Sequence, residues 1–99
     1  MRRGTTPTLR INVKGVEVDK LTSIYLTLKQ GNVELEKTNV EIDAENNRLI
    51  VDLSQEETLM FDAGGIRVQF RAILDNGRAV ASNIVMSNMN DILKEGVIE

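Results

Sequence analysis

The sequence predicts an all-β fold, an immunoglobulin-like β-sandwich of about seven antiparallel strands with one short helix near residues 55–61. Apolar and polar side chains alternate at period two in several separate segments, which is the pattern of half-buried strands. Turn-forming residues separate these segments at intervals of roughly 8 to 12 residues, as in sandwich domains. A single helix-capping motif interrupts the series. An open barrel is the alternative arrangement of the same strands.

The chain is expected to form one domain, residues 1–99. Its 99 residues are 41% hydrophobic and 27% charged, which is ordinary for a globular domain, and domains mostly hold roughly 100 to 150 residues. Residues 1–7 are polar and contain a proline, so we expect an extended arm before the first strand. Residues 91–99 follow the last predicted strand and form a C-terminal tail.

The first half of the chain is predicted to supply five strands. In each of them apolar residues occupy alternate positions, so that one face is buried. Glycine and asparagine residues between the segments favour turns, and Gln30-Gly31-Asn32 predicts a hairpin between the second and third strands. The five predicted strands cover residues 9–13, 24–29, 33–37, 40–43 and 49–53.

The predicted helix begins with a capping box. Ser54 and Glu57 have the S-x-x-E spacing, in which the hydroxyl accepts from the third amide and the carboxylate accepts from the cap amide. One or two helical turns follow and carry apolar side chains toward the end of the core. Asp62-Ala63-Gly64-Gly65 then ends the helix.

The clearest hairpin comes last. Apolar residues alternate with arginine and glutamine over residues 66–74, and Asp75-Asn76-Gly77 predicts the turn. The return strand over residues 78–89 has no single parity, and a bulge near Ser82 and Asn83 would reconcile its two halves.

The composition argues against catalysis and against metal binding. The chain has no histidine and no cysteine, so the commonest general base and the thiol nucleophile are both missing. Its carboxylates are expected on solvated strand faces or in the helix cap. We therefore expect no enzymatic activity, no cofactor and no metal site.

Charge and hydropathy limit the partners further. With 12 basic and 15 acidic residues the net charge is −3, and such a surface repels nucleic acid on average. The longest aliphatic run, Leu49-Ile50-Val51, is far below the roughly 20 residues that a membrane span needs. No apolar segment of the signal-peptide kind follows Arg2 and Arg3. We expect a chain that is cytoplasmic as synthesised and not inserted in a membrane.

Two groups of residues are candidates for binding a protein partner. Arg67 and Arg71 share a strand face and Arg78 follows on the paired strand, so their guanidinium groups could bind an acidic surface. The alternative is a solvated face whose arginines pair with acidic neighbours. The second group consists of surplus aliphatic residues in the tail, which either dock on a neighbouring subunit or fold along the domain's own edge: Ile92, Leu93, Val97 and Ile98.

Several stretches resemble small prophage-encoded proteins of Gram-positive gut bacteria. They are RGTTPT at 3–8, QEETLMF at 55–61, VQFRA at 68–72, DNGRAVASN at 75–83 and DILKEGVI at 91–98. More distantly, the order of elements is similar to the N-terminal immunoglobulin-like domains of phage baseplate and tail proteins. The resemblance implies a non-enzymatic structural part of a phage tail or baseplate, located in the virion, with other tail proteins or further copies of itself as partners.

Two other functions remain open from the sequence. The alternative function is a small ligand-binding module for a cell-surface glycan or protein, which an exposed aromatic cluster around Tyr25 would favour. An enzyme would require a buried pair of carboxylates in a cleft.

Overall fold

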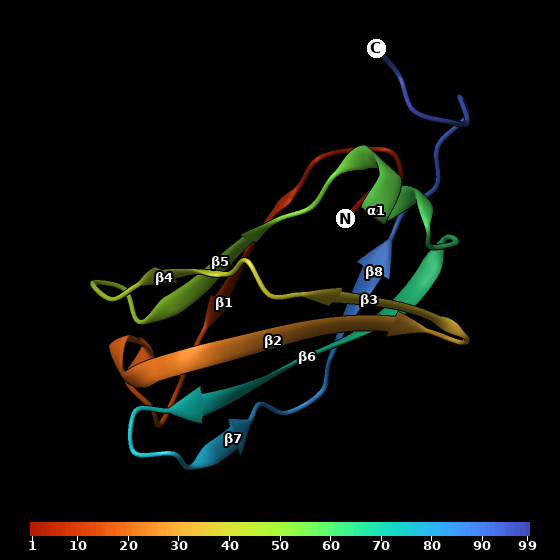
Figure 1. Ribbon diagram of the computed structural model, residues 1–99. Coiled ribbons are helices and arrows are strands. Elements are labelled where there is room, and N and C mark those ends of the chain that lie inside the picture. The colour runs from red at the N-terminus through yellow and green to blue at the C-terminus, as the bar shows by residue number, and fades with distance from the viewer.

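A computed structural model describes all residues from Met1 to Glu99 and contains two antiparallel β-sheets (Figure 1). One sheet has three strands in the order β1-β5-β4, with bounds Thr8–Asn12, Arg48–Asp52 and Glu41–Asp43. The other has the order β3-β2-β6-β7, and β8 pairs with β6 as well. Its strands are β2 (Leu21–Gln30), β3 (Val33–Lys37), β6 (Gly64–Leu74), β7 (Ala79–Ala81) and β8 (Val85–Met89).

The fold is predominantly β, in agreement with the predicted class, and all five strands expected in the first half of the chain are present. The predicted hairpin joins β2 to β3, with Gln30 opposite Val33 and Gly31 at a positive φ of 55°. Glycine suits this position because it tolerates the left-handed region that tight hairpin turns need. A short 3₁₀ helix, η1 (Val18–Lys20), precedes β2.

The structure has eight strands rather than seven because a bulge divides the predicted return strand. Arg71 of β6 faces Ala81 of β7, whereas Val68 of β6 faces Val85 of β8. Two residues of β6 therefore oppose three residues between the paired positions, which is the count of a bulge. Ser82 lies at this point, and its N–H donates to the carbonyl of Phe70 at 2.9 Å. The bulge predicted near Ser82 and Asn83 is confirmed.

The capping box is confirmed, and the helix α1 (Gln55–Leu59) is shorter than predicted. The Glu57 N–H donates to Ser54 Oγ at 3.1 Å, and the Ser54 N–H donates to Glu57 Oε1 at 2.8 Å. Met60 closes the helix, and the chain then turns so that Phe61 is fully buried. The helices α1 and η1 have five and three residues, and both are far too short to cross a bilayer.

The core lies between the two sheets, and α1 lies at one end of it (Figure 1). Phe61, just after α1, belongs to this core. Inward residues of β2, β5 and β6 alternate with exposed ones, as their sequence pattern predicts. Thr58 is the single buried polar residue. Its hydroxyl group lies within hydrogen-bond distance of two carbonyl acceptors, Thr5 O and Gln55 O. The largest fully buried apolar side chains are Phe61, Leu26, Leu28, Leu49, Ile66 and Met89.

The N-terminal residues do not run as the extended arm that the sequence predicted. Arg2 forms a parallel bridge with Asn90, and a turn follows at Arg3 and Gly4, where Gly4 has a φ of 69°. The start of the chain is thereby held against the end of β8. Both termini lie at the α1 end of the molecule (Figure 1).

Candidate functional site

A groove of about 680 Å³ opens between the two sheets. One side is β1, the edge strand of the three-stranded sheet, and the other side is β7 and β8, which form the edge of the larger sheet. The groove is open because no further strand covers this side of the sandwich. Both of its walls are therefore strand edges, where backbone groups are free to pair with an added strand.

Apolar side chains that point inward from both sheets line this groove. Leu9 and Ile11 from β1 face Val68 and Val80 from the larger sheet, and all four are only partly buried. Val85, which shares the inward face with its β6 partner Val68, is 59% exposed. These residues occupy the alternate, inward-facing positions of a core, but no further strand covers them.

The β7–β8 edge also lacks charged residues. No Asp, Glu, Lys or Arg occurs from residue 79 to residue 90, although 27% of the chain is charged. Strand edges are commonly protected by charges, and an apolar uncharged edge invites pairing with another strand. Three consecutive side chains are more than half exposed here: Ile84, Val85 and Met86.

The N-terminal residues cover only the last part of this edge. The Met1 ammonium donates to Asn88 O at 2.9 Å, and the Asn90 N–H donates to Met1 O at 2.8 Å. The Arg3 N–H donates to Asn90 O at 3.0 Å. Beyond Asn88, toward the bulge, β8 has no partner other than β6. The free part of the edge lies directly beside the groove.

Two cationic side chains are the charged members of the groove lining. Arg10 and Lys14 contribute to it from β1 and the residues that follow β1, and no Asp or Glu lines the groove. Both side chains are exposed and neither forms an ion pair. The groove therefore suits an extended segment with apolar side chains and a negative charge.

The structure separates the three arginines that the sequence grouped. Arg67 and Arg71 lie on the outer face of β6, opposite Lys29 and Tyr25 of β2. Arg78 precedes β7, and its carbonyl accepts from the Leu74 N–H at 2.8 Å, so it lies opposite an inward-facing residue. The three do not form one row. All three are exposed, and none pairs with an acidic neighbour.

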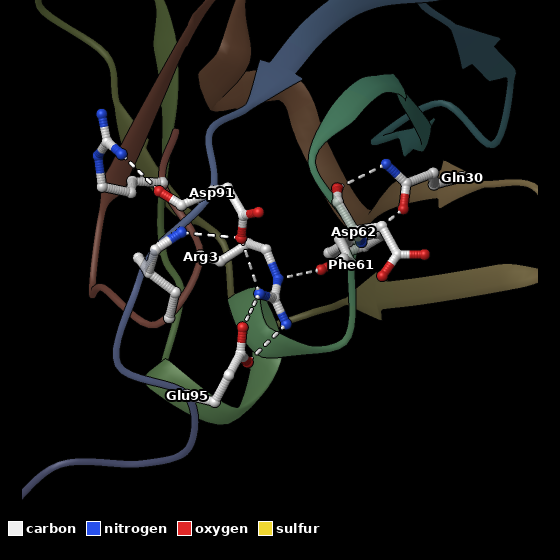
Figure 2. Close-up of polar contacts among 8 residues, drawn as sticks. Arg3, Gln30, Phe61, Asp62, Asp91 and Glu95 are labelled. Carbon is white, nitrogen blue, oxygen red and sulfur yellow. Dashed lines mark hydrogen bonds and ion pairs between the residues drawn. The ribbon is translucent and has the colours of Figure 1, made fainter.

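The C-terminal tail is held by Arg3 (Figure 2). The Arg3 guanidinium donates to Phe61 O at 2.6 Å, to Asp91 Oδ1 at 3.1 Å and to both Glu95 oxygens at 2.8 and 3.2 Å. The hydrogen bonds to Glu95, and then the one to Asp91, raise the pKa of Arg3 above its ordinary value. The Ile92 N–H and then Arg3 hold the pKa of the Asp91 carboxyl below its ordinary value. We name these contacts of Arg3 the Arg3 clamp.

The four tail aliphatics predicted to bind a partner have different surroundings. Ile92 is partly buried and lies next to Gly4, whereas Leu93 is fully exposed. Val97 and Ile98 are 48% and 58% exposed, and the backbone of Ile98 exchanges two hydrogen bonds with the Gln55 side chain. The tail is thus fixed mainly by polar contacts while most of its apolar surface faces solvent.

The aromatic residues do not gather around Tyr25. Phe61 and Phe70 are 0% and 6% exposed, and Tyr25 is the one aromatic ring at the surface, 45% exposed. No three Asp or Glu residues lie close enough together to hold a metal ion. The apolar groove, at about 680 Å³, is larger than the hollow of about 310 Å³ beside Tyr25.

Comparisons of the chain with protein-family models, with curated proteins and with solved structures find no match. The groove and the Arg3 clamp were not predicted from the sequence. The charge-free stretch from residue 79 to residue 90 was the one sequence signal that pointed to the groove. Nothing near Arg3 in the sequence indicates its partners, which are 58 to 92 residues away.

Proposed function

We propose that the protein is a non-enzymatic assembly module that binds an extended segment of a protein partner in the groove between β1 and β7–β8. The observation that carries the proposal is the apolar lining of this groove between two open strand edges. Strand addition at such an edge gives affinity through main-chain hydrogen bonds and specificity through alternate side chains. The inward residues Ile11, Val80 and Val85 would provide those side-chain contacts.

We assign the module to a prophage tail or baseplate, where it would contact other tail proteins or copies of itself. The resemblance of its sequence to small prophage-encoded proteins supports this assignment. So does the order of its elements, in which a short capped helix precedes a glycine-led strand and a final hairpin, as in the immunoglobulin-like domains of baseplate proteins. We also propose that the fold is an immunoglobulin-like sandwich. Its uncovered edge would be the binding site.

A crosslinking experiment tests the groove. The chain has no cysteine, so Val85→Cys places one thiol in the groove, to which a photoactivatable group can be attached. Ile42→Cys is the matched control, because Ile42 is 41% exposed on β4 and lies outside the groove. We expect crosslinks to a tail protein, or to a second copy, from the Val85 position only. Equal crosslinking from both positions would contradict binding in the groove.

The tail assignment has its own test. Purified virions of the phage that encodes the chain should contain it in the tail fraction, detected with an antibody. Particles without the chain would overturn the tail assignment but not the groove.

A further inference from the structure

We infer that the occupant of the groove is the C-terminal tail, residues 92–99, of a second copy of this chain. The inference rests on the proposed function and names the partner of the same groove. It starts from the tail itself, whose Leu93 side chain is fully exposed and whose Val97 and Ile98 are about half exposed. A segment with this much uncovered apolar surface is stabilised by transfer into an apolar site.

The tail and the groove have complementary charge. From residue 92 to residue 99 there are two acidic residues and one lysine. The groove lining has Arg10 and Lys14 and no acidic residue. Apolar side chains interspersed with carboxylates would thus meet apolar side chains bordered by cations, and opposite potentials favour the correct encounter between two copies.

Residues 92–99 can also span the groove. Eight residues of extended chain span ~26 Å, whereas the five residues of β1 span ~17 Å. Residues 92–99 are therefore long enough to run along the whole β1 edge of the groove. Their backbone groups would pair with the free edge of β8 or of β1.

The tail does not reach its own groove, because the N-terminal residues block the way. To lie beside its own β8, the tail would have to turn back directly after Asn90. At that point Met1, Arg2 and Arg3 already occupy the edge of β8 through their contacts with Asn88 and Asn90. The Arg3 clamp further holds the tail beside α1 (Figure 2). The tail of a second copy is not joined to this copy's Asn90 and does not have to make that turn.

An interface between the tail of one copy and the groove of the next is heterologous. Each copy then offers one tail and one groove, so the contact repeats until a ring closes or a filament grows. The clamp pairs an Arg3 side chain that is 13% exposed with Asp91 and Glu95, which are 67% and 63% exposed. The exchange replaces these contacts in the donating copy with contacts in the groove of its neighbour.

Mixing two variants tests the inference on the full chain. Leu93→Asp/Val97→Asp disables the tail, and Val85→Asp disables the groove at a residue that is 59% exposed. We expect wild type to assemble with rising concentration in light scattering, and each variant alone to stay monomeric. Their equimolar mixture should give a species of twice the monomer mass and nothing larger. Ile42→Asp is the surface control and should assemble like wild type.

The other outcomes overturn the inference, and they also separate it from the proposed function. A mixture that stays monomeric while wild type assembles indicates an isologous contact instead of tail exchange. A tail variant that assembles like wild type, beside a monomeric Val85→Asp, leaves the groove in use but not by the tail. Monomeric wild type at every concentration excludes a second copy, and the crosslinking experiment then decides whether another protein binds the groove.

A second measurement covers the case in which Val85→Asp unfolds. A synthetic peptide of residues 91–99 is titrated into the tail variant and followed by NMR of methyl groups. We expect shifts at Ile11 and Val80 in the groove and none at Ile73 on the outer face. Unchanged spectra at all three positions would overturn the inference.

Discussion

The side-chain carbonyl of Asn47 accepts a hydrogen bond from the Val18 N–H at 2.9 Å. The Asn47 amide donates to Val13 O at 2.8 Å and to Val16 O at 2.9 Å, so one side chain satisfies three backbone groups between the end of β1 and the first residue of η1. Asn47 also has a positive φ of 49°, which asparagine tolerates better than most residues. This contact fixes the turn between β4 and β5 to the segment that leads into β2.

Asn47→Ala should therefore destabilise the fold by about 3 kcal/mol, because it removes these hydrogen bonds and leaves the N–H of buried Val18 without a partner. Asn47→Gly loses the same bonds but accepts the positive φ, so it should cost about 1 kcal/mol less. Denaturant unfolding measures both, with the exposed Asn39→Ala as control. Equal stability of all three variants would contradict a structural role for Asn47.

The capping box gives a second prediction. Ser54→Ala should cost about 1 kcal/mol, because the Glu57 N–H loses its acceptor at the start of α1. Ser23→Ala is the control, since Ser23 is exposed and makes no side-chain hydrogen bond. An unfolding midpoint of Ser54→Ala equal to that of the control would count against the contribution of the cap.

Glu57 predicts how stability depends on pH. Burial alone raises the pKa of Glu57, but the hydrogen bonds from Lys37 Nζ and from the Ser54 N–H outweigh it and hold the pKa below its ordinary value of 4.5. The unfolded chain therefore binds more protons than the folded chain in this range. Stability from Glu57 is fully present above pH 4.5 and is lost as the pH falls through the folded pKa. The pKa of Asp43 is also lowered, first by the hydrogen bond from the Asn46 side chain. The pKa of Asp91 is lowered as well, so both residues contribute to stability in the same direction as Glu57.

We expect Glu57→Gln to be less stable than wild type at pH 7, and the difference should shrink below pH 4. Glutamine keeps the shape of the cap but not the ion pair with Lys37, which lies at 2.7 Å. Glu56→Gln removes a charge from the same turn without affecting the cap, because Glu56 is exposed. Thermal unfolding from pH 3 to pH 7 measures both variants. A constant difference between Glu57→Gln and wild type across this range would contradict the role of the carboxylate.

Local patterns account for the features that the sequence predicted correctly. The alternation along β6 and the S-x-x-E spacing at Ser54 depend on neighbours within a few residues. The same alternation failed to indicate the exposure of Ile42, which is 41% exposed because β4 is a three-residue edge strand. Side-chain pattern determines which face of a strand is apolar, but the position of the strand in the sheet decides whether that face is covered.

The candidate site depends on the positions of strands in the sheets, and local sequence patterns do not specify these positions. Leu9, Ile11 and Val68 follow the alternation of core residues in the sequence, and only the absence of a strand between β1 and β8 leaves them open. The Arg3 clamp likewise depends on where the two ends of the chain meet. Such relations between distant segments follow from topology, which no motif in this chain specifies.

The bulge beside the groove gives the last prediction. Ser82 Oγ accepts from the Phe70 N–H at 3.0 Å, and Phe70 is 6% exposed. Ser82→Ala leaves this N–H unsatisfied and should cost about 1–3 kcal/mol, with faster hydrogen exchange at the Phe70 amide. Ser82→Thr keeps the hydroxyl and should restore slow exchange, whereas Asn83→Ala, whose side chain is exposed, should leave it unchanged. If Ser82→Ala exchanged as slowly as wild type, the hydroxyl would not be what closes the bulge.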